Sequence, residues 1–553
     1  MHLARRLSFF WLVLGSFAVR GTDVACPGPV PPTPPSGVCT VTAGSSALRI
    51  QADLLGPNGV IGNGQLIVGS DGLIACVACD CSTHPDYATA TRIECPQGVV
   101  SPGLIDALNR LAFSQNPPAT DSGERYEHRH DWRLGLNMHT PISAPGGASN
   151  DQRRWAELRA LLAGTTSMNS VGGGVSGMVR NLDLSTDAAA LAASQWRTQT
   201  FPLGDSSGTE LSCANYAYAS AQPEIETRVV AEGIAMRANT EWTCMTGQYA
   251  GGVDRIEAEP LTGMIGVDAI DVNESRLHGT SFVWTPRYNV RLYGHPGVPG
   301  VFRALGVPIA LASNWTLTGS MSLQRELACA DDLNQDYLAA QFSDRELWEM
   351  VTRNPAQIGG FGQAIGTLVP GLRADLAIFN AQARSNYRAV IDAEPADVAL
   401  VMRAGTALHG DAALMDALGQ SSCDSLGVCG TAKKVCVQSE FGVSLSTLTT
   451  GNTGNNPLLL CDAPSDEPSC LPARVTMTGG AATYTGQITP SDSDGDGIAN
   501  DVDNCPTVFN PIRPMDTNAQ ADVDADGIGD VCDACPLVSG ESACFDVFKD
   551  GFE

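Results

Sequence analysis

The chain has 553 residues, which is too long for a single hydrophobic core and predicts two to four domains. Hydrophobic residues make up 43% of it, a globular composition that excludes a largely disordered protein. The formal net charge of −27 argues against nucleic acid as a partner. The acidity is concentrated, because residues 491–553 hold 15 acidic residues against only Arg513 and Lys549.

The first residues have the pattern of a secretory signal peptide, which we assign to residues 1–18. Arg5 and Arg6 precede an apolar stretch that ends in small residues. No apolar run is long enough to span a bilayer, so no transmembrane segment is expected. The 18 cysteines fit an exported protein (periplasmic, cell-surface or secreted), where thiols form disulfides. Local candidate bridges are Cys26–Cys39 and Cys461–Cys470.

The next segments predict an extended arm followed by a β-domain. Residues 19–46 are rich in proline and glycine, which is typical of an arm. Residues 47–98 contain short alternating segments separated by turns, which predict strands. The apolar stretch that begins at Val99 is interrupted by Pro102 and Gly103, and it predicts a strand buried on both faces.

From residue 99 to residue 365, candidate strands alternate with helical patterns over about 260 residues, the rhythm of a (β/α)8 TIM barrel. Predicted helices cover residues 151–162 and 344–353, and the later predicted strands are residues 164–167, 177–182, 228–234, 263–270, 281–289 and 308–315. The remaining expected segments are a second β-part at 366–410, an extension at 411–440, a linker at 441–490, an acidic module at 491–536 and a tail at 537–553.

The run Pro102-Gly103-Leu104-Ile105-Asp106 resembles the first barrel strand of the amidohydrolase superfamily, P-G-[LIF]-[IV]-D-x-H-x-H. Residues 369–379 and 397–405 resemble the part of its β-domain that follows the barrel. The resemblance implies an α/β fold with a TIM-like barrel inserted in a composite β-sandwich domain. It also implies a hydrolase of non-peptide C–N bonds.

The ligands that this resemblance implies are substituted. An H-x-H pair at a strand end aims two imidazoles into the barrel mouth, where a divalent metal would acidify a bound water. Leu108 has no lone pair to offer, and Arg110 is a fixed cation. We therefore expect a catalytically impaired pseudoenzyme that binds a small molecule or a protein, and a transition metal in the barrel is disfavoured. The family-equivalent positions are Leu108, Arg110, Val229, Asp268 and Asn314.

Two alternatives remain open. In the first alternative, the barrel is an active metal hydrolase whose metal is held by His128 and His130, a second H-x-H in the first loop. A structural role is more usual for such a loop. The second alternative is a calcium-stiffened surface or adhesion protein in which the barrel serves as a scaffold. A separate hypothesis concerns the barrel mouth, where the metal-binding histidines are substituted. There the Arg110 guanidinium replaces the metal, with Asp268 as counter-ion and Asn314 as hydrogen-bond acceptor.

Residues 491–536 contain one acidic pattern twice, thirty residues apart. Alternating carboxylates followed by glycine can wrap Ca²⁺, and the absence of a glutamate at position twelve separates them from an EF-hand. The pattern resembles thrombospondin type 3 repeats, which implies a Cys505–Cys532 disulfide and calcium as cofactor and partner. The implied calcium ligands are Asp492, Asp494, Asp496, Asp503, Asp522, Asp524, Asp526, Asp530 and Asp533.

Overall fold

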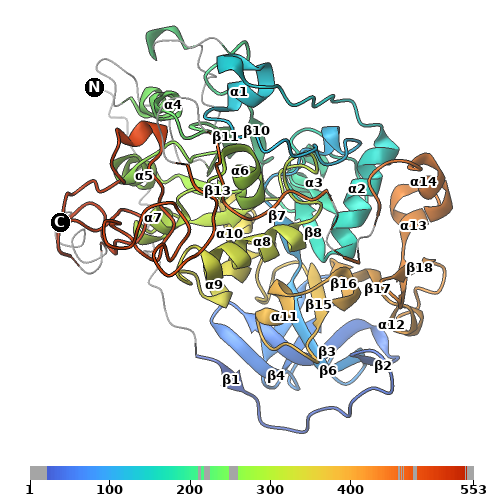
Figure 1. Ribbon diagram of the computed structural model, residues 1–553. Helices are drawn as coiled ribbons and strands as arrows, with labels where there is room; N and C mark the ends of the chain where they lie inside the picture. Colours follow the sequence, from blue (N-terminus) through green and yellow to red (C-terminus); the bar gives the residue numbers. More distant parts are fainter. Residues whose placement is uncertain are drawn as a thin grey trace, which may run out of the picture.

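The computed structural model describes residues 22–208, 213–216, 225–247, 260–458, 461–462, 464, 466–476, 483–541 and 544. The expected signal peptide and most of the expected tail lie outside these residues. A mixed sheet lies at the base of the molecule in Figure 1, and parallel strands with their helices lie above it. The acidic C-terminal segment lies against one side of the parallel strands.

An eleven-stranded mixed sheet combines strands that precede and follow the parallel strands. β6 (Ala90–Pro102) pairs antiparallel with β15 (Leu376–Asn380), with Val100 opposite Ile378, and both of these side chains are buried in the core of the sheet. The other strands of this sheet are β1 (Val24–Ala25), β2 (Thr40–Thr42), β3 (Ser45–Gly56), β4 (Gly59–Val68), β5 (Ile74–Ala78), β16 (Val398–Arg403), β17 (Thr406–Asp411), β18 (Asp424–Val428) and β19 (Thr431–Val435).

Among the described residues between β6 and β15, eight short strands form two parallel sheets. One sheet contains β7 (Leu104–Asp106), β8 (Thr165–Met168) and β9 (Arg180–Asn181). The other contains β10 (Arg197–Gln199), β11 (Glu226–Val229), β12 (Pro260–Thr262), β13 (Ser281–Trp284) and β14 (Ile309–Leu311). Backbone hydrogen bonds link the two sheets at both ends, from Trp196 N to Leu182 O at 2.9 Å and from Ala107 N to Leu311 O at 3.3 Å.

Helices separate most of these strands, as the alternating pattern predicted. The predicted helix at residues 151–162 is α2 (Asn150–Leu162), which begins with a capping box between Ser149 and Gln152. The other helices are α1 (Arg129–Leu134), α3 (Ser185–Ala190), α4 (Met236–Thr246), α5 (Ala269–Leu277), α6 (Pro286–Tyr293), α7 (Pro299–Ala304), α8 (Leu323–Asp336), α9 (Asp344–Glu349), α10 (Arg353–Ile358), α11 (Arg388–Ile391), α12 (Ala412–Ala417), α13 (Val437–Phe441) and α14 (Leu445–Gly451).

Some strand predictions are wrong. Residues 263–270 are not a strand, because β12 ends at Thr262 and Asp268 caps the start of α5. The strand predicted at residues 281–289 stops at Trp284, since Pro286 begins α6, a position that proline favours. The prediction omitted β10, which is three residues long and has no apolar residue.

The described part of residues 441–490 contacts the helices and the loops between them. The carbonyl oxygen of Asn456 accepts a hydrogen bond from Trp155 Nε1 at 2.9 Å. Arg474 is buried and contacts the Glu127 carboxylate. The segment satisfies its backbone through side chains of other elements, a pattern that local sequence cannot reveal.

All 18 cysteines are joined in nine disulfides, and the predicted Cys505–Cys532 pair is one of them. The local pairs Cys26–Cys39 and Cys461–Cys470 are wrong. β2 pairs with β6 in a register that brings Cys39 opposite Cys95, so these two form a disulfide. The other cysteines of the two wrong pairs form Cys26–Cys79, Cys429–Cys461 and Cys329–Cys470. None of the described helices has the length and apolar character needed to cross a membrane.

Candidate functional site

The five family-equivalent positions lie at or beyond the carboxyl ends of the parallel strands. Leu108 and Val229 are buried, and neither side chain can bind a metal. Arg110 Nε donates a hydrogen bond to Asn314 Oδ1 at 3.1 Å, and its Nη1 donates one to Thr200 Oγ1 at 3.2 Å. The Arg110 side chain therefore joins the residues that follow β7 to those that follow β14, with Asn314 as the expected acceptor.

The expected Arg110–Asp268 ion pair is wrong, since none joins these side chains in the described structure. Asp268 Oδ1 instead accepts hydrogen bonds from the backbone N–H groups of Ile270 at 2.9 Å and Asp271 at 3.1 Å. Because β12 ends six residues before it, Asp268 is a helix cap rather than a strand-end residue.

Little free space remains beside Arg110. A cavity lined in part by Asp106, Arg110 and Trp315 has a volume of about 10 Å³, room for roughly one water molecule. Burial raises the pKa of Asp106 to about 6, although Ser313 donates a hydrogen bond to Asp106 Oδ2 at 2.5 Å. This cavity cannot hold an organic substrate in the conformation described.

The two histidines of the first loop lie in a buried, charged cluster with Glu241, and one ligand atom from each residue lies within 4.8 Å of the others. His128 Nε2 is 2.8 Å from Glu241 Oε1, and His130 Nε2 is 2.8 Å from Asp205 Oδ2. Arg129 Nη2 lies 2.6 Å from Asp205 Oδ2 and 3.6 Å from Glu241 Oε1. Both imidazoles already have carboxylate partners, and a guanidinium occupies the space between the acids.

A second buried carboxylate, Glu232, was not singled out from the sequence. Its Oε1 accepts hydrogen bonds from Tyr288 Oη at 2.6 Å, Tyr293 Oη at 2.5 Å and Trp132 Nε1 at 3.3 Å. Burial and the Glu232 charge raise the pKa values of both tyrosines, so both keep their protons for these bonds. The donors come from distant parts of the chain, and no local motif signals the cluster.

The first acidic loop is shaped by hydrogen bonds from its own backbone. Asp492 Oδ2 accepts the N–H of Gly497 at 3.1 Å, and Gly497 has φ 89°, a conformation suited to glycine. Asp496 Oδ1 accepts the N–H of Ile498 at 2.8 Å. Within the described residues, the Oδ2 atoms of Asp494 and Asp503 are buried without a hydrogen-bond partner.

The second acidic loop repeats this geometry thirty residues later. Asp522 Oδ2 accepts the N–H of Gly527 at 3.0 Å, and Gly527 has φ 93°. Asp526 Oδ1 accepts the N–H of its neighbour Ile528 at 2.9 Å. In the described structure, the carboxylate atoms that are buried and unpartnered here are Asp522 Oδ1, Asp524 Oδ2 and Asp530 Oδ2.

The crowded carboxylates are difficult to ionise without a cation. Burial, together with the charge of the neighbouring Asp496 carboxylate, raises the pKa of Asp494 to about 8. Burial raises the pKa of Asp496 to about 7 and that of Asp530 to about 7. The unpartnered oxygens and the raised pKa values both fit a hard divalent cation, which prefers carboxylate and carbonyl oxygens.

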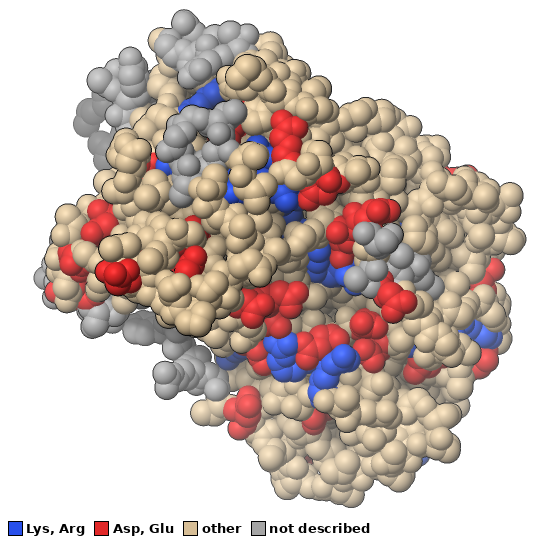
Figure 2. All heavy atoms as spheres, in the orientation of Figure 1, with Lys and Arg blue, Asp and Glu red and all other residues tan. Residues whose placement is uncertain are grey.

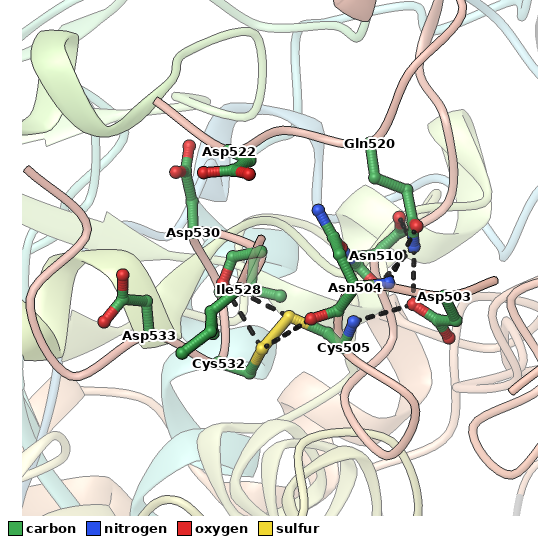
Figure 3. Close-up of a disulfide and its surroundings, with 12 residues drawn as sticks. Asp503, Asn504, Cys505, Asn510, Gln520, Asp522, Ile528, Asp530, Cys532 and Asp533 are labelled. Atoms are coloured by element: carbon green, nitrogen blue, oxygen red, sulfur yellow. Dashed lines mark hydrogen bonds between the residues drawn. A yellow bond between two sulfur atoms is a disulfide. The ribbon is translucent and has the colours of Figure 1, made fainter. Parts of the chain in front are cut away.

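Figure 3 shows how the loops are joined. The Cys505–Cys532 disulfide links the residues that follow the first loop to the end of the second, with an S–S distance of 1.98 Å. Gln520 Nε2, between the loops, donates a hydrogen bond to Asp503 Oδ1 at 2.7 Å. Figure 2 shows acidic side chains exposed over this C-terminal segment, at the left of the molecule.

Residues 490–513 and 519–542 match the thrombospondin type 3 repeat. The two acidic loops, with the disulfide between them, lie inside these two matches. A search of curated proteins with the whole sequence found no match.

Several solved structures share a low overall similarity with this chain. An adenosine deaminase from Xanthomonas campestris with bound zinc is 14% identical with a TM-score of 0.44, over 65% of this chain and 92% of that chain. An atrazine chlorohydrolase from Arthrobacter aurescens TC1 complexed with zinc is 15% identical with a TM-score of 0.46, over 65% and 95%. An aminofutalosine deaminase from Helicobacter pylori is 12% identical with a TM-score of 0.42, over 66% and 99%. Similarities this low support no inference about the reaction.

The type 3 repeats are anchored to the parallel-strand region. Arg513, between the loops, donates from Nη1 to the carbonyl oxygens of Ile265 and Val267, each at 2.9 Å. Its Nη2 donates to Asp516 Oδ1 at 2.8 Å. The backbone N–H of Phe509 donates to Tyr337 O at 2.8 Å. The repeats are therefore packed against the body of the protein.

Proposed function

We propose that the type 3 repeats, residues 491–536, bind calcium and that calcium fixes them against the rest of the protein. The observation that carries this proposal is the repeated set of buried, unpartnered carboxylate oxygens in two loops of the same geometry. In each loop the middle aspartate, Asp494 or Asp524, accepts a backbone N–H at Oδ1 and leaves its Oδ2 without a partner among the described residues. Calcium would supply the positive charge that balances these carboxylates.

The test is a titration of the full chain with calcium, in which isothermal calorimetry measures the binding. Asp494→Asn and Asp524→Asn, the equivalent residues of the two loops, should each remove calcium binding to one loop. Asp501→Asn is the matched control, because Asp501 is exposed and lies outside the proposed ligand set. Equal calcium binding by the wild type and the Asp494→Asn/Asp524→Asn double variant would contradict the proposal.

We also propose that the eight parallel strands form a TIM-like barrel inserted in a composite β-domain. The hydrogen bonds at both junctions between the two parallel sheets support closure of the strand ring. The pairing of β6 with β15, on either side of the inserted strands, supports a composite domain. A crystal structure of the full chain would test both points, because it would show whether the strand ring closes and whether β6 pairs with β15.

For the barrel, we propose a catalytically impaired, amidohydrolase-related protein that serves as a binding protein. Leu108 and Val229 offer no ligand atom, Arg110 is bonded to Asn314, and the cavity beside them has little volume. The expected result is no stoichiometric zinc, iron or manganese in purified protein and no hydrolysis of cyclic or linear amides. Metal-dependent hydrolysis would contradict this proposal.

The convergence of His128, His130 and Glu241 favours one alternative, a relocated metal site. For a metal to bind there, the Arg129 guanidinium would have to leave the two carboxylates. Elemental analysis of the full chain and of the His128→Gln variant separates the two cases. Zinc that is present in the wild type and absent from the variant would support the relocated site.

We further propose that the protein functions outside the cytoplasm. The complete pairing of its 18 cysteines supports an oxidising compartment. Fractionation of the source cells, with an antibody to detect the protein in each fraction, would test this. A cytoplasmic pool of the mature protein would contradict it.

A further inference from the structure

A cavity of about 180 Å³ lies outside the parallel strands, between α2, α8 and the residues that follow α11. It is separate from both calcium loops. Its walls include the apolar side chains of Ala163, Met321, Ala328 and Ile391. The cavity therefore combines a small volume with a partly apolar lining, and its polar groups decide what it can hold.

Arg159 of α2 lines this cavity and is unusual among the buried arginines. Only 6% of its surface is exposed, and it has no carboxylate partner within the described structure. Its Nε and Nη2 donate to the carbonyl oxygens of Pro457 and Asn456, at 3.0 and 3.2 Å. The other buried arginines of the described chain, which all form ion pairs with carboxylates, are Arg129, Arg228, Arg287, Arg291, Arg474 and Arg513.

This isolation has a cost. Burial lowers the pKa of Arg159 to about 10, with no acidic group to offset it. A buried guanidinium without a counter-ion is expensive, and an anion that bonds to it would remove much of that cost.

Gln324 of α8 is a second unsatisfied group on the same cavity. It is 3% exposed, and neither its Oε1 nor its Nε2 has a hydrogen-bond partner among the described residues. Buried amides nearly always have partners, so this one indicates a ligand or bound water. Together, Arg159 and Gln324 offer donors for an anionic oxygen and one acceptor.

The cavity rim carries negative charge. Asp332 is exposed there, and within the described chain it has no hydrogen bond or ion pair, while Glu394 adds a second exposed carboxylate. The other charged lining groups are already paired, Arg325 with Glu467 and both Asp331 and Asp392 with Arg388. The unpaired charges are thus positive inside and negative at the rim.

We propose that this cavity binds a free α-amino acid with a compact aliphatic side chain. Its carboxylate would bond to Arg159 and Gln324, its ammonium group would face Asp332 and Glu394, and its side chain would contact the apolar wall. A guanidinium matches a carboxylate through two parallel N–H bonds, which favours this orientation.

Calorimetry on the full chain with three matched probes tests the proposal. L-valine carries both charges, isovalerate lacks the ammonium group, and isobutylamine lacks the carboxylate. We expect L-valine to bind with 1:1 stoichiometry and each single-charge analogue to bind at least tenfold more weakly. The proposal would be overturned if L-valine did not bind at about 10 mM, a concentration well above a dissociation constant of about 1 mM.

Two variants separate binding from folding. Arg159→Met should weaken L-valine binding at least tenfold, whereas Arg154→Met, on the same helix and outside the cavity, should not. Gln324→Leu removes an amide without partners, so it should raise the melting temperature and still weaken binding. Unchanged L-valine affinity in a folded Gln324→Leu protein would overturn the assignment of the site.

Discussion

Arg110 Nε donates a hydrogen bond to Asn314 Oδ1 at 3.1 Å, and this contact joins the ends of β7 and β14. Asn314 has φ 61°, a left-handed conformation that asparagine and aspartate tolerate better than most residues. The pair gives Asn314 a structural role between the residues that follow β7 and β14, and it leads to the first prediction.

Asn314→Asp should stabilise the protein at pH 7 by about 1 kcal/mol, because hydrogen bonds to charged groups are stronger than neutral ones. Pairing with Arg110 should hold the pKa of the new carboxyl below its unfolded value. The gain is therefore present above the unfolded pKa of about 3.9 and is lost as the pH falls through the folded pKa. Thermal melts at pH 7 and pH 3 test this. Asn314→Ala is the control that should destabilise at both, and a lower melting temperature for Asn314→Asp at pH 7 would refute the ion pair.

Removal of calcium should loosen residues 491–536 while the remainder stays folded. The acidic loops carry many like charges, which repel one another unless a cation lies between them. We expect a chelator to accelerate proteolytic cleavage within this segment, with fragments of the preceding chain surviving. Added magnesium serves as the control for general ionic effects. Equal cleavage rates with and without chelator would count against calcium.

Loss of the Cys505–Cys532 disulfide should weaken both loops. The bridge closes a sequence separation of 27 residues, for which the loop-entropy estimate gives about 3–4 kcal/mol. The Cys505→Ala/Cys532→Ala variant should therefore need more calcium for half-maximal protection from proteases. The Cys76→Ala/Cys81→Ala variant removes a bridge in the mixed sheet and should leave calcium protection unchanged.

Arg513→Met should detach the type 3 repeats from the parallel-strand region. The substitution leaves Asp516 without its ion-pair partner and removes the hydrogen bonds to Ile265 and Val267. Loss of one partner of a buried pair lowers the free energy of unfolding by about 3 kcal/mol. Hydrogen exchange should then rise at residues 265–267. Arg303→Met, which breaks an exposed pair with Glu346, should change stability by less than about 0.5 kcal/mol.

Glu157 provides a pH prediction. Burial raises its pKa to about 8, and Asn181 Nδ2 donates to its Oε1 at 2.7 Å. Because the folded pKa exceeds the unfolded one, wild-type stability contributed by this group is present below the unfolded pKa and is lost as the pH rises towards 8. Glu157→Gln should therefore be more stable than the wild type at pH 8 and nearly equal to it near pH 4. The exposed Glu541→Gln is the control, and parallel pH curves for wild type and Glu157→Gln would contradict the raised pKa.

Local signals predicted much of this molecule. Pro102 and Gly103 preceded a buried strand, and a side chain on Gly103 would lie 2.2 Å from the Thr166 side chain, so glycine is required there. The repeated Asp-x-Asp-x-Asp-Gly pattern predicted two loops, and equivalent backbone hydrogen bonds to Asp492 and Asp522 shape both. Both signals depend on residues close together in the sequence.

The errors came from long-range relationships. Asp268 was aligned with a strand end, although Asp271 three residues later is the signal of a capping box. The partners of Glu232 and the isolation of Arg159 depend on segments more than fifty residues away. No pattern within a short window distinguishes Arg159, without a counter-ion, from the buried arginines that have one.

The pairing of β6 with β15 has a consequence for biogenesis. Val100 meets Ile378 only after the parallel strands between them have been synthesised, so a chain that is still incomplete presents β6 with an open edge. Open edges invite aggregation with other chains. Early oxidation of Cys39 with Cys95 would cover part of β6 with β2 before β15 arrives. The order in which the disulfides form therefore affects how much of this protein reaches its folded state.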